Sequence, residues 1–209
     1  MLRILIADDH TVVRKGLKQI LMEAFKSALI EEVADAEELV KEALLKEWDV
    51  IITDLSMPGR SGLDALHQIR QHDPKLPVLI LSIHPEEQYA VRVLKAGAAG
   101  YMSKDMASEE LVNAVNRVLL GKKYISPLVA EKLAAELDLD ETKLPHETLS
   151  DREFDVLKLI AVGRSISEIA GMMSLSPTTI STYRTRIMAK LNMKTNADLI
   201  LYSLEHKLT

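Results

Sequence analysis

The sequence contains no cysteine, and only 4% of its 209 residues are aromatic. Without thiols the chain can form neither disulfides nor thiolate metal sites, which suits a reducing compartment. No apolar run approaches the roughly 20 residues that a membrane-spanning helix needs. The first residues lead directly into an apolar strand and lack the basic start of a signal peptide. We therefore expect a cytoplasmic protein with no membrane partner.

The composition suits globular domains. Hydrophobic residues make up 47% of the chain and charged residues 27%, so each half can bury a core. The length fits one large or two small domains. The formal net charge is -5, yet residues 149–209 contain more Lys and Arg than Asp and Glu. Only this last segment is a candidate for binding a polyanion.

The first part of the chain is organised around residues 50–59. Val50 to Thr53 is an apolar, largely β-branched run that predicts a buried strand, Asp54 follows it, and Pro58-Gly59 predicts a turn. Strand and helix patterns alternate five times over residues 1–122. This alternation predicts a doubly wound, five-stranded parallel sheet with helices on both faces. The expected strands are Leu2–Ala7, Leu29–Ala34, Val50–Thr53, Val78–Leu81 and Ala99–Met102.

Chemically active side chains follow four of these strands. Because the carboxyl ends of parallel strands meet at one edge of the sheet, the four loops should form one shallow cleft. An Asp after a strand is more often a turn former or a helix N-cap, but that explanation does not account for all four loops together. The residues concerned are Asp8, Asp9, Asp54, Ser82 and Lys104.

Three carboxylates in one cleft favour a hard divalent cation, Mg²⁺ or Mn²⁺. Asp54 is the best candidate for a nucleophile toward a phosphoryl group, while the adjacent Asp8 and Asp9 suit metal binding. Lys104 and Ser82 would bind the phosphoryl oxygens. A phosphatase or phosphotransferase with an aspartyl nucleophile is an alternative, but such enzymes usually need a second acid where this chain has Ser56.

These motifs resemble the receiver domain of two-component response regulators, a flavodoxin-like fold. The resemblance rests on residues 6–10, 54–59, 96–98 and 100–104 and on Ser82. It implies that Asp54 accepts a phosphoryl group from a histidine kinase. It also implies that Asp9, Asp54 and the backbone carbonyl of Ser56 hold Mg²⁺ directly, and that Asp8 acts through water. Ser82 would turn toward the phosphoryl group, and Tyr101 would follow from exposed to buried.

Three residues depart from the usual receiver pattern. Ser56 stands where many relatives have Asn, so its side chain should give less help in placing an attacking water. Ile83 stands where they often have Ala or Gly, and its branched side chain should narrow access to Asp54. His84 follows Ile83 and is either an exposed loop residue or a neighbour of the phosphoryl group. We expect slow self-hydrolysis of the aspartyl phosphate, and no enzymatic activity beyond that and self-phosphorylation from a donor.

The chain after residue 122 changes character. Residues 123–148 are predicted to be a linker, with a short helix from Leu128 to about Leu137 and an acidic exposed stretch from Asp138 to Glu147. Residues 149–209 predict a small all-α domain of four helices. Ser150, Ser165 and Thr195 each occupy an N-cap position, and Ser176-Pro177 opens the third helix.

Two short helices joined by a tight turn indicate a helix-turn-helix. The third helix, up to about Leu191, contains no acidic residue and presents short polar and basic side chains suited to a DNA major groove. The candidate DNA contacts are Thr178, Ser181, Thr182, Arg184, Thr185, Arg186 and Lys190.

Residues 149–209 resemble the LuxR-type helix-turn-helix, so the whole chain is similar to NarL/FixJ-type regulators. The recognition helix departs from the common pattern: Ser181 replaces a Lys, as in the BvgA-like and GacA-like branch. DNA contacts are therefore expected chiefly from Thr182, Arg184, Thr185 and Arg186. In the family the last helix pairs with its two-fold mate, which implies a homodimer on DNA. The candidate dimer residues are Leu199, Ile200, Tyr202 and Leu204.

The sequence thus predicts a response regulator that is phosphorylated at Asp54 and regulates transcription as a dimer on double-stranded promoter DNA. Its partners would be a cognate histidine kinase and, as a further candidate, RNA polymerase. The alternative is a constitutive DNA-binding regulator whose receiver only mediates protein contacts, and Ile83 is the one feature in its favour.

Overall fold

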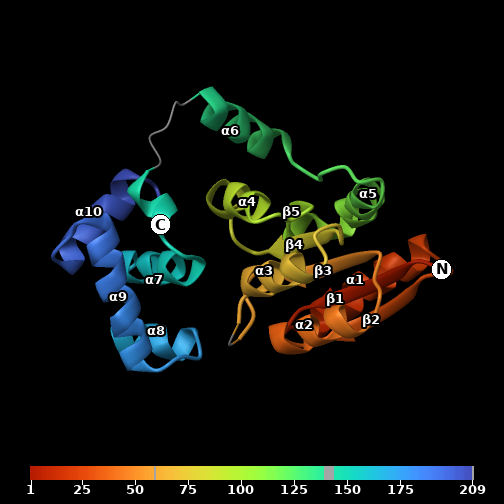
Figure 1. Cartoon of the computed structure of the whole chain (residues 1–209), viewed down its shortest axis with the longest axis horizontal. Coiled ribbons are helices and arrows are strands. Elements are labelled where there is room, and N and C mark those ends of the chain that lie inside the picture. The colour runs from red at the N-terminus through yellow and green to blue at the C-terminus, as the bar shows by residue number, and fades with distance from the viewer. Residues whose placement is uncertain (59, 139–143, 209) are drawn as a thin grey trace. The chain divides into compact units, whose positions relative to one another are not determined.

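The computed structural model describes residues 1–58, 60–138 and 144–208. Gly59 of the predicted turn and residues 139–143 of the predicted linker lie outside them. The chain forms two compact units, Met1–Asp138 and Leu139–Thr209. The first contains a parallel sheet and the second is helical (Figure 1). The strands are β1 (Arg3–Ala7), β2 (Leu29–Val33), β3 (Val50–Asp54), β4 (Val78–Ser82) and β5 (Gly100–Ser103).

The sheet has the order β2-β1-β3-β4-β5 and is parallel throughout, which confirms the predicted fold. β2 lies on one side of β1, and β3, β4 and β5 follow in order on its other side. The strand order therefore reverses between β1 and β3. Open α/β sheets bind their ligands at such a switch point, outside the carboxyl ends of the strands.

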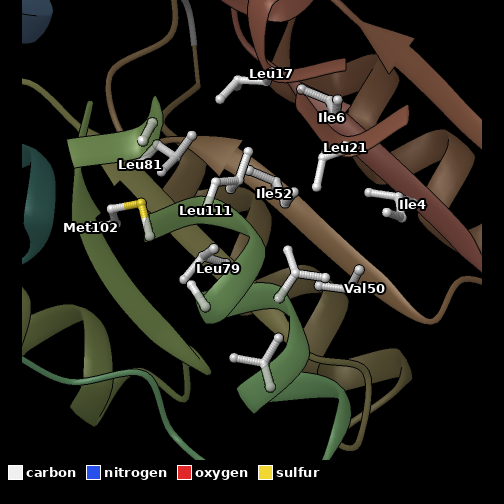
Figure 2. Close-up of a cluster of buried hydrophobic side chains, with 14 of the residues drawn as sticks. Ile4, Ile6, Leu17, Leu21, Val50, Ile52, Leu79, Leu81, Met102 and Leu111 are labelled. Carbon is white, nitrogen blue, oxygen red and sulfur yellow. The ribbon is translucent and has the colours of Figure 1, made fainter. Parts of the chain in front are cut away.

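Crossovers between parallel strands are right-handed in almost all proteins, so the reversal in the direction of winding places helices on both faces of the sheet. Helices α1 and α5 pack together on one face over alternate residues of β1, β3 and β4 (Figure 2). The other alternate strand residues, such as Leu5, Ile51 and Ile80, are also fully buried. The helices are α1 (Thr11–Ala24), α2 (Ala36–Leu45), α3 (Gly62–His72), α4 (Glu86–Lys95) and α5 (Ala107–Leu119).

The start of α5 differs from the sequence prediction. Ser108 with Glu109 and Glu110 after it predicts an N-cap at Ser108, but a 3-10 turn, η1 (Lys104–Met106), precedes α5, and Met106 occupies the cap position without a side-chain hydrogen bond. Ser103 instead caps the 3-10 turn by accepting from the backbone N–H of Asp105. This turn leads directly from β5 into α5 and fixes Lys104 at the edge of the sheet.

Residues after α5 pack with the first unit. The Tyr124 backbone N–H donates to the Ala99 carbonyl at 2.9 Å, and Tyr124 forms a parallel bridge with Gly100 of β5. The following helix, α6 (Pro127–Asp138), is capped by Ser126, contacts α4 and buries Val129. Residues 123–138, assigned to a linker from the sequence, therefore contribute to the fold of the first unit.

The second unit consists of a short 3-10 turn, η2 (Pro145–Thr148), and four helices: α7 (Asp151–Ala161), α8 (Ile166–Met172), α9 (Pro177–Leu191) and α10 (Asn196–Glu205). The predicted N-caps are confirmed, since Ser150, Ser165, Ser176 and Thr195 each accept a backbone hydrogen bond from the third residue of their helix. Helix α7 packs against α9 and α10, and α8 packs against α9. Among the described residues, no helix combines the length and apolarity required to cross a membrane.

Gly100 is a position at which the fold requires glycine. A Cβ atom there would lie 2.7 Å from the Tyr124 carbonyl oxygen and 2.9 Å from Leu79 Cδ1. We expect Gly100→Ala to destabilise the first unit by about 1–3 kcal/mol, because the backbone of Tyr124 must move. Gly16 in α1 has no atom within 4 Å of its ideal Cβ. Gly16→Ala is the matched control and should stabilise the helix by about 0.5–1 kcal/mol. Urea unfolding measures both, and equal effects would contradict the predicted contact.

Candidate phosphoacceptor and DNA-binding sites

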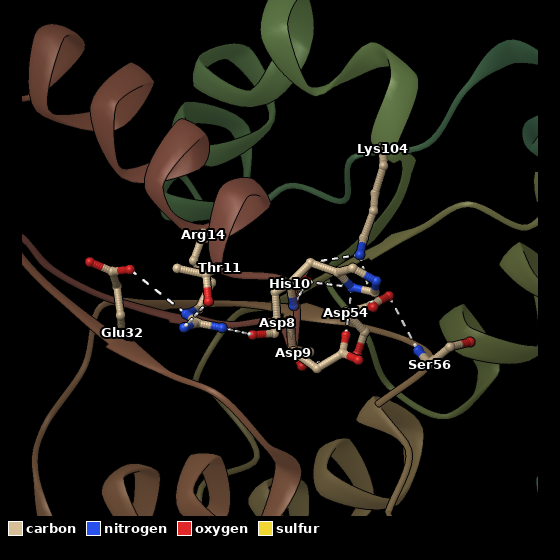
Figure 3. Close-up of polar contacts among 10 residues, drawn as sticks. Asp8, Asp9, His10, Thr11, Arg14, Glu32, Asp54, Ser56 and Lys104 are labelled. Carbon is tan, nitrogen blue, oxygen red and sulfur yellow. Dashed lines mark hydrogen bonds and ion pairs between the residues drawn. The ribbon is translucent and has the colours of Figure 1, made fainter. Parts of the chain in front are cut away.

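Two neighbouring strands bring the predicted acids together. Asp8 follows the last residue of β1, and Asp54 is the last residue of β3. Because β1 and β3 pair directly in parallel, both carboxylates lie at the same edge of the sheet (Figure 3). Asp8 and Asp54 are buried, whereas Asp9 is partly exposed. Burying two carboxylates this close together is unfavourable unless positive charge is nearby.

Lys104 supplies that charge. Its Nζ lies 2.6 Å from Asp8 Oδ2 and 2.8 Å from Asp54 Oδ2. Burial raises the pKa of the Asp54 carboxyl, and the hydrogen bond and charge of Lys104 oppose that rise. Burial alone would lower the pKa of Lys104, but its contacts with Asp54 and Asp8 outweigh burial and raise it. Lys104 is therefore protonated at neutral pH, as an electrostatic role at this site requires.

The donor set suits a hard cation. Ligand atoms of Asp8, Asp9, His10 and Asp54 all lie within 4.8 Å of one another. The Oδ2 atom of Asp8 and the Oδ1 atom of Asp9 are buried. Among the described residues, neither atom accepts a hydrogen bond of good geometry, although Lys104 Nζ lies near the first atom and His10 Nδ1 near the second. Three carboxylates opposed by one ammonium leave a net negative charge. The arrangement is that of a site able to bind a divalent metal.

Two residues of this site carry no role in the sequence prediction. His10 Nδ1 lies 2.8 Å from Asp9 Oδ1 and 3.3 Å from Asp8 Oδ1. Arg14 donates to the Asp8 carbonyl at 2.5 Å and to Thr11 Oγ1 at 3.3 Å, which holds the loop between β1 and α1 (Figure 3). The place of His10 directly after the acid pair could have indicated its contact. The reach of Arg14 back from the first turn of α1 depends on a rotamer and has no sequence signal.

The predicted switch residues also lie at this edge. The Ser56 backbone N–H donates to Asp54 Oδ1 at 3.2 Å. Ser82 is fully buried, and its Oγ accepts from the His84 backbone N–H at 3.0 Å. Tyr101 is buried as well, with its hydroxyl donating to the His84 carbonyl at 2.8 Å. The structure therefore holds Tyr101 in the inward position that the resemblance associates with phosphorylation.

The second unit has the predicted helix-turn-helix in α8 and α9. Its candidate DNA contacts separate into an open set and a tethered pair. The open set has exposed side chains and consists of Thr178, Ser181, Thr182, Thr185 and Arg186. In the tethered pair, Arg184 Nε donates to Asn196 Oδ1 at 2.6 Å, and Lys190 Nζ donates to Glu153 Oε2 at 2.6 Å. Arg184 thus joins α9 to the start of α10, and Lys190 joins α9 to α7.

The Lys190–Glu153 pair serves the fold. Glu153 is buried and also forms the capping box of α7 with Ser150. Burial acts to raise the pKa of Glu153, but the hydrogen bonds from Lys190 and Ser150 outweigh it and lower the pKa from its ordinary value of 4.5. Lys190 also donates to the Thr148 carbonyl at 3.2 Å, just before α7. Lys190, which the sequence predicts to contact DNA, therefore forms hydrogen bonds within its own unit.

Helix α10 has one buried face and one open face. Leu199 and Tyr202 are buried, and the Tyr202 hydroxyl lies 2.9 Å from His146 Nδ1 of η2. Leu201 and Leu204 are exposed, and Ile200 lies between the two faces. Of the four predicted dimer residues, Leu199 and Tyr202 therefore pack within the unit. The open apolar stripe is formed by Ile200, Leu201 and Leu204.

We expect Lys190→Met to destabilise the second unit by about 1–3 kcal/mol, because it leaves the buried Glu153 carboxylate without its charged donor. The lowered pKa of Glu153 means that this stabilisation is present above pH 4.5 and is lost as the pH falls through the pKa of the folded state. The difference from wild type should therefore shrink on acidification. Urea unfolding from pH 7 to pH 3 measures it. Exposed Lys194→Met is the control, and equal losses for the two variants would contradict the structural role.

Comparison with known proteins identifies the family of each unit. Residues 4–116 match the response regulator receiver domain, and residues 147–203 match the bacterial regulatory proteins of the luxR family. The response regulator UvrY of Escherichia coli K12 is 34% identical over all of this chain and 96% of its own length. The oxygen regulatory protein NreC of Staphylococcus carnosus is 38% identical, with 99% of each chain covered.

Among solved structures, RcsB of Salmonella enterica serovar Typhimurium, bound to the promoter rprA in the presence of a phosphomimetic, superposes with a TM-score of 0.63. It is 28% identical and covers 97% of this chain and 98% of its own. The matches span both units in the order found here. The chain belongs to the two-component response regulators of the NarL/FixJ type, DNA-binding transcriptional regulators with a receiver domain followed by a LuxR-type helix-turn-helix domain.

Proposed function

We propose that Asp54 is the phosphoacceptor of this response regulator. The observation that carries the proposal is the contact of Lys104 with both Asp8 and Asp54 at the switch point of the sheet. In the proposed step, a carboxylate oxygen of Asp54 attacks the phosphorus of a phosphohistidine on the kinase. The new oxygen–phosphorus bond forms as the nitrogen–phosphorus bond breaks, and the electron pair stays with the imidazole. Lys104 then compensates the charge brought by the phosphoryl oxygens.

The carboxylates of Asp8, Asp9 and Asp54, with the backbone carbonyl of Ser56, fit Mg²⁺ or Mn²⁺ by their oxygen chemistry and net charge. A bound divalent cation would offset the repulsion between the acidic site and the incoming phosphoryl group. The chain's own residues orient the nucleophile: the Ser56 N–H holds Asp54 Oδ1 and Lys104 holds Oδ2. Asp54 therefore presents a fixed carboxylate at the carboxyl edge of the sheet.

Ser82 and Tyr101 form the proposed switch. The Ser82 hydroxyl accepts one hydrogen bond from the His84 backbone and keeps its own proton to donate to a phosphoryl oxygen. Tyr101 on the neighbouring strand holds the carbonyl of the same His84. A phosphoryl group on Asp54 would favour the conformation with both side chains turned inward, and this shift in population is the signal.

The output is transcriptional regulation by a homodimer on double-stranded promoter DNA in the cytoplasm, with a cognate histidine kinase upstream and RNA polymerase as a further partner. The exposed side chains of α9, above all Arg186, would contact phosphates and base edges. The stripe of Ile200, Leu201 and Leu204 on α10 is proposed as the dimer surface, because Leu201 and Leu204 are exposed and Ile200 is only half-buried in the single chain. Dimerisation would place two copies of α9 on paired half-sites.

The phosphoacceptor assignment predicts a specific mass change. Wild-type protein incubated with Mg²⁺ and acetyl phosphate should gain the mass of one phosphoryl group, because Ser56 and Lys104 orient the Asp54 carboxylate. Asp54→Asn should gain none, since an amide is not a nucleophile of this kind. Asp105→Asn, an exposed acid on the adjacent 3-10 turn, is the matched control and should behave as wild type. Equal mass gain by Asp54→Asn would contradict the assignment.

The DNA-binding assignment predicts a difference between two exposed basic residues of the second unit. Arg186→Ala should weaken binding to library-selected DNA by about fivefold to a hundredfold, the usual range for one base or phosphate contact. Lys207→Gln removes a positive charge after the end of α10, away from the recognition helix, and should change the affinity by less than about twofold. Fluorescence anisotropy at several salt concentrations measures both. A loss in Lys207→Gln equal to that in Arg186→Ala would indicate only an effect of net charge.

A further inference from the structure

A pocket with a volume of about 680 Å³ lies at the amino edge of the sheet, at the other end of the strands from Asp54. Small-molecule sites in proteins have volumes of this order. The pocket is lined by the start of β1, by the end of α2 and the segment that leads to β3, and by the end of α3 and the loop that follows it. Ala43, Trp48 and Leu76 are buried and form its floor, and Trp48 is the only tryptophan of the chain.

One guanidinium in this pocket has a donor without an acceptor. Arg3 is the first residue of β1 and is half-buried, and its Cζ lies 5.5 Å from the centre of the Trp48 ring. Its Nε is buried and donates no hydrogen bond within the part of the chain that the structure describes. Lys46 differs, because its Nζ lies 2.6 Å from Glu31 Oε2 and 2.8 Å from Glu42 Oε2. Stacking on Trp48 explains where the Arg3 side chain lies but leaves a buried charged donor unsatisfied, which is unusual in proteins.

Acidic and apolar side chains line the same pocket. Glu47 and Asp49 lie in the segment between α2 and β3 and are exposed, and Asp73 follows α3. Asp49 Oδ2 accepts from the Arg3 backbone N–H at 2.7 Å, which fixes this carboxylate near the start of β1. Leu45 is 69% exposed at the end of α2. A ligand with only negative charge would be repelled by these acids, whereas a ligand with both charges has an opposite charge for each.

We propose that this pocket binds a small zwitterion with an apolar body, of the chemical class of the aliphatic α-amino acids. The ligand's carboxylate pairs with the Arg3 guanidinium, whose planar set of N–H donors suits a carboxylate. The ligand's ammonium faces the carboxylates of Glu47 and Asp49. The aliphatic chain covers Leu45 and Leu76, which removes apolar surface from water. The arrangement gives Arg3 Nε the acceptor that the protein itself does not supply.

The test uses the full-length, unphosphorylated chain, with the fluorescence of Trp48 as the reporter of the pocket. L-leucine should change the emission saturably. Three related compounds each lack one part of it: 4-methylpentanoate has no ammonium, 3-methylbutylamine has no carboxylate and glycine has no apolar body. Each should bind roughly tenfold to a hundredfold more weakly than L-leucine, the factor that one charged hydrogen bond or the burial of a few methylene groups represents.

Two variants separate the pocket from general effects of charge. Arg3→Gln should weaken the binding of L-leucine by roughly tenfold to a hundredfold, because the guanidinium is lost. Lys41→Gln removes an exposed positive charge of α2 outside the pocket and should bind L-leucine as wild type does. Saturating L-leucine should also raise the thermal unfolding midpoint of wild type and leave that of Arg3→Gln unchanged. The comparison of the four compounds on wild type decides the matter even if Arg3→Gln does not fold.

The absence of a saturable change with L-leucine would overturn the inference. Equal affinity of wild type for all four compounds would overturn it as well, and would indicate adsorption to apolar surface. Binding of 4-methylpentanoate as tight as that of L-leucine would overturn the zwitterionic class, and equal binding by folded Arg3→Gln and wild type would overturn the role of the guanidinium. None of these results depends on phosphorylation of Asp54, so failure here leaves the proposed function intact.

Discussion

The contact of one ammonium group with two buried carboxylates governs the receiver unit. Lys104 lies between Asp8 and Asp54, and without it the buried charges would repel each other at the carboxyl edge of the sheet. The pairing of β1 with β3 brings Asp8 and Asp54 together, and the 3-10 turn that follows the short β5 places Lys104 beside them. The same cluster carries a net negative charge, so the interaction that stabilises the folded site also prepares it for a cation and a phosphoryl group.

The sequence predicts the parts of this structure that depend on local pattern. The apolar runs, their alternation with helices and the polar residues at their ends together specify the sheet and the edge at which Asp8, Asp54, Ser82 and Lys104 meet. The capping residues of the second unit are equally local, because Ser150 bonds within its own helix. In these cases the pattern within each element determines its structure, and the predicted sheet and N-caps are confirmed.

The remaining features depend on side chains that meet across elements. The sequence predicts that Lys190 contacts DNA from the recognition helix, whereas in the structure its side chain bonds to Glu153 of α7. The sequence predicts that Tyr202 belongs to the dimer surface, whereas in the structure its hydroxyl contacts His146 of η2. From the sequence, His84 is either an exposed loop residue or a neighbour of the phosphoryl group, and its place in a loop does not distinguish the two. The hydrogen bond between His84 Nε2 and Ser56 Oγ depends on the rotamers of both side chains. Periodicity and motif spacing carry no information on these pairings.

The proposed switch requires that a phosphoryl group on Asp54 changes DNA binding by the second unit. The most direct test is the affinity of wild type and Asp54→Asn for library-selected DNA, each with and without acetyl phosphate and Mg²⁺, at fixed salt. We expect the donor to tighten DNA binding by wild type, to leave the affinity of Asp54→Asn unchanged and to promote dimers in sedimentation of wild type only. Equal affinity in all four samples would contradict the switch and favour a constitutive regulator whose receiver serves protein contacts alone.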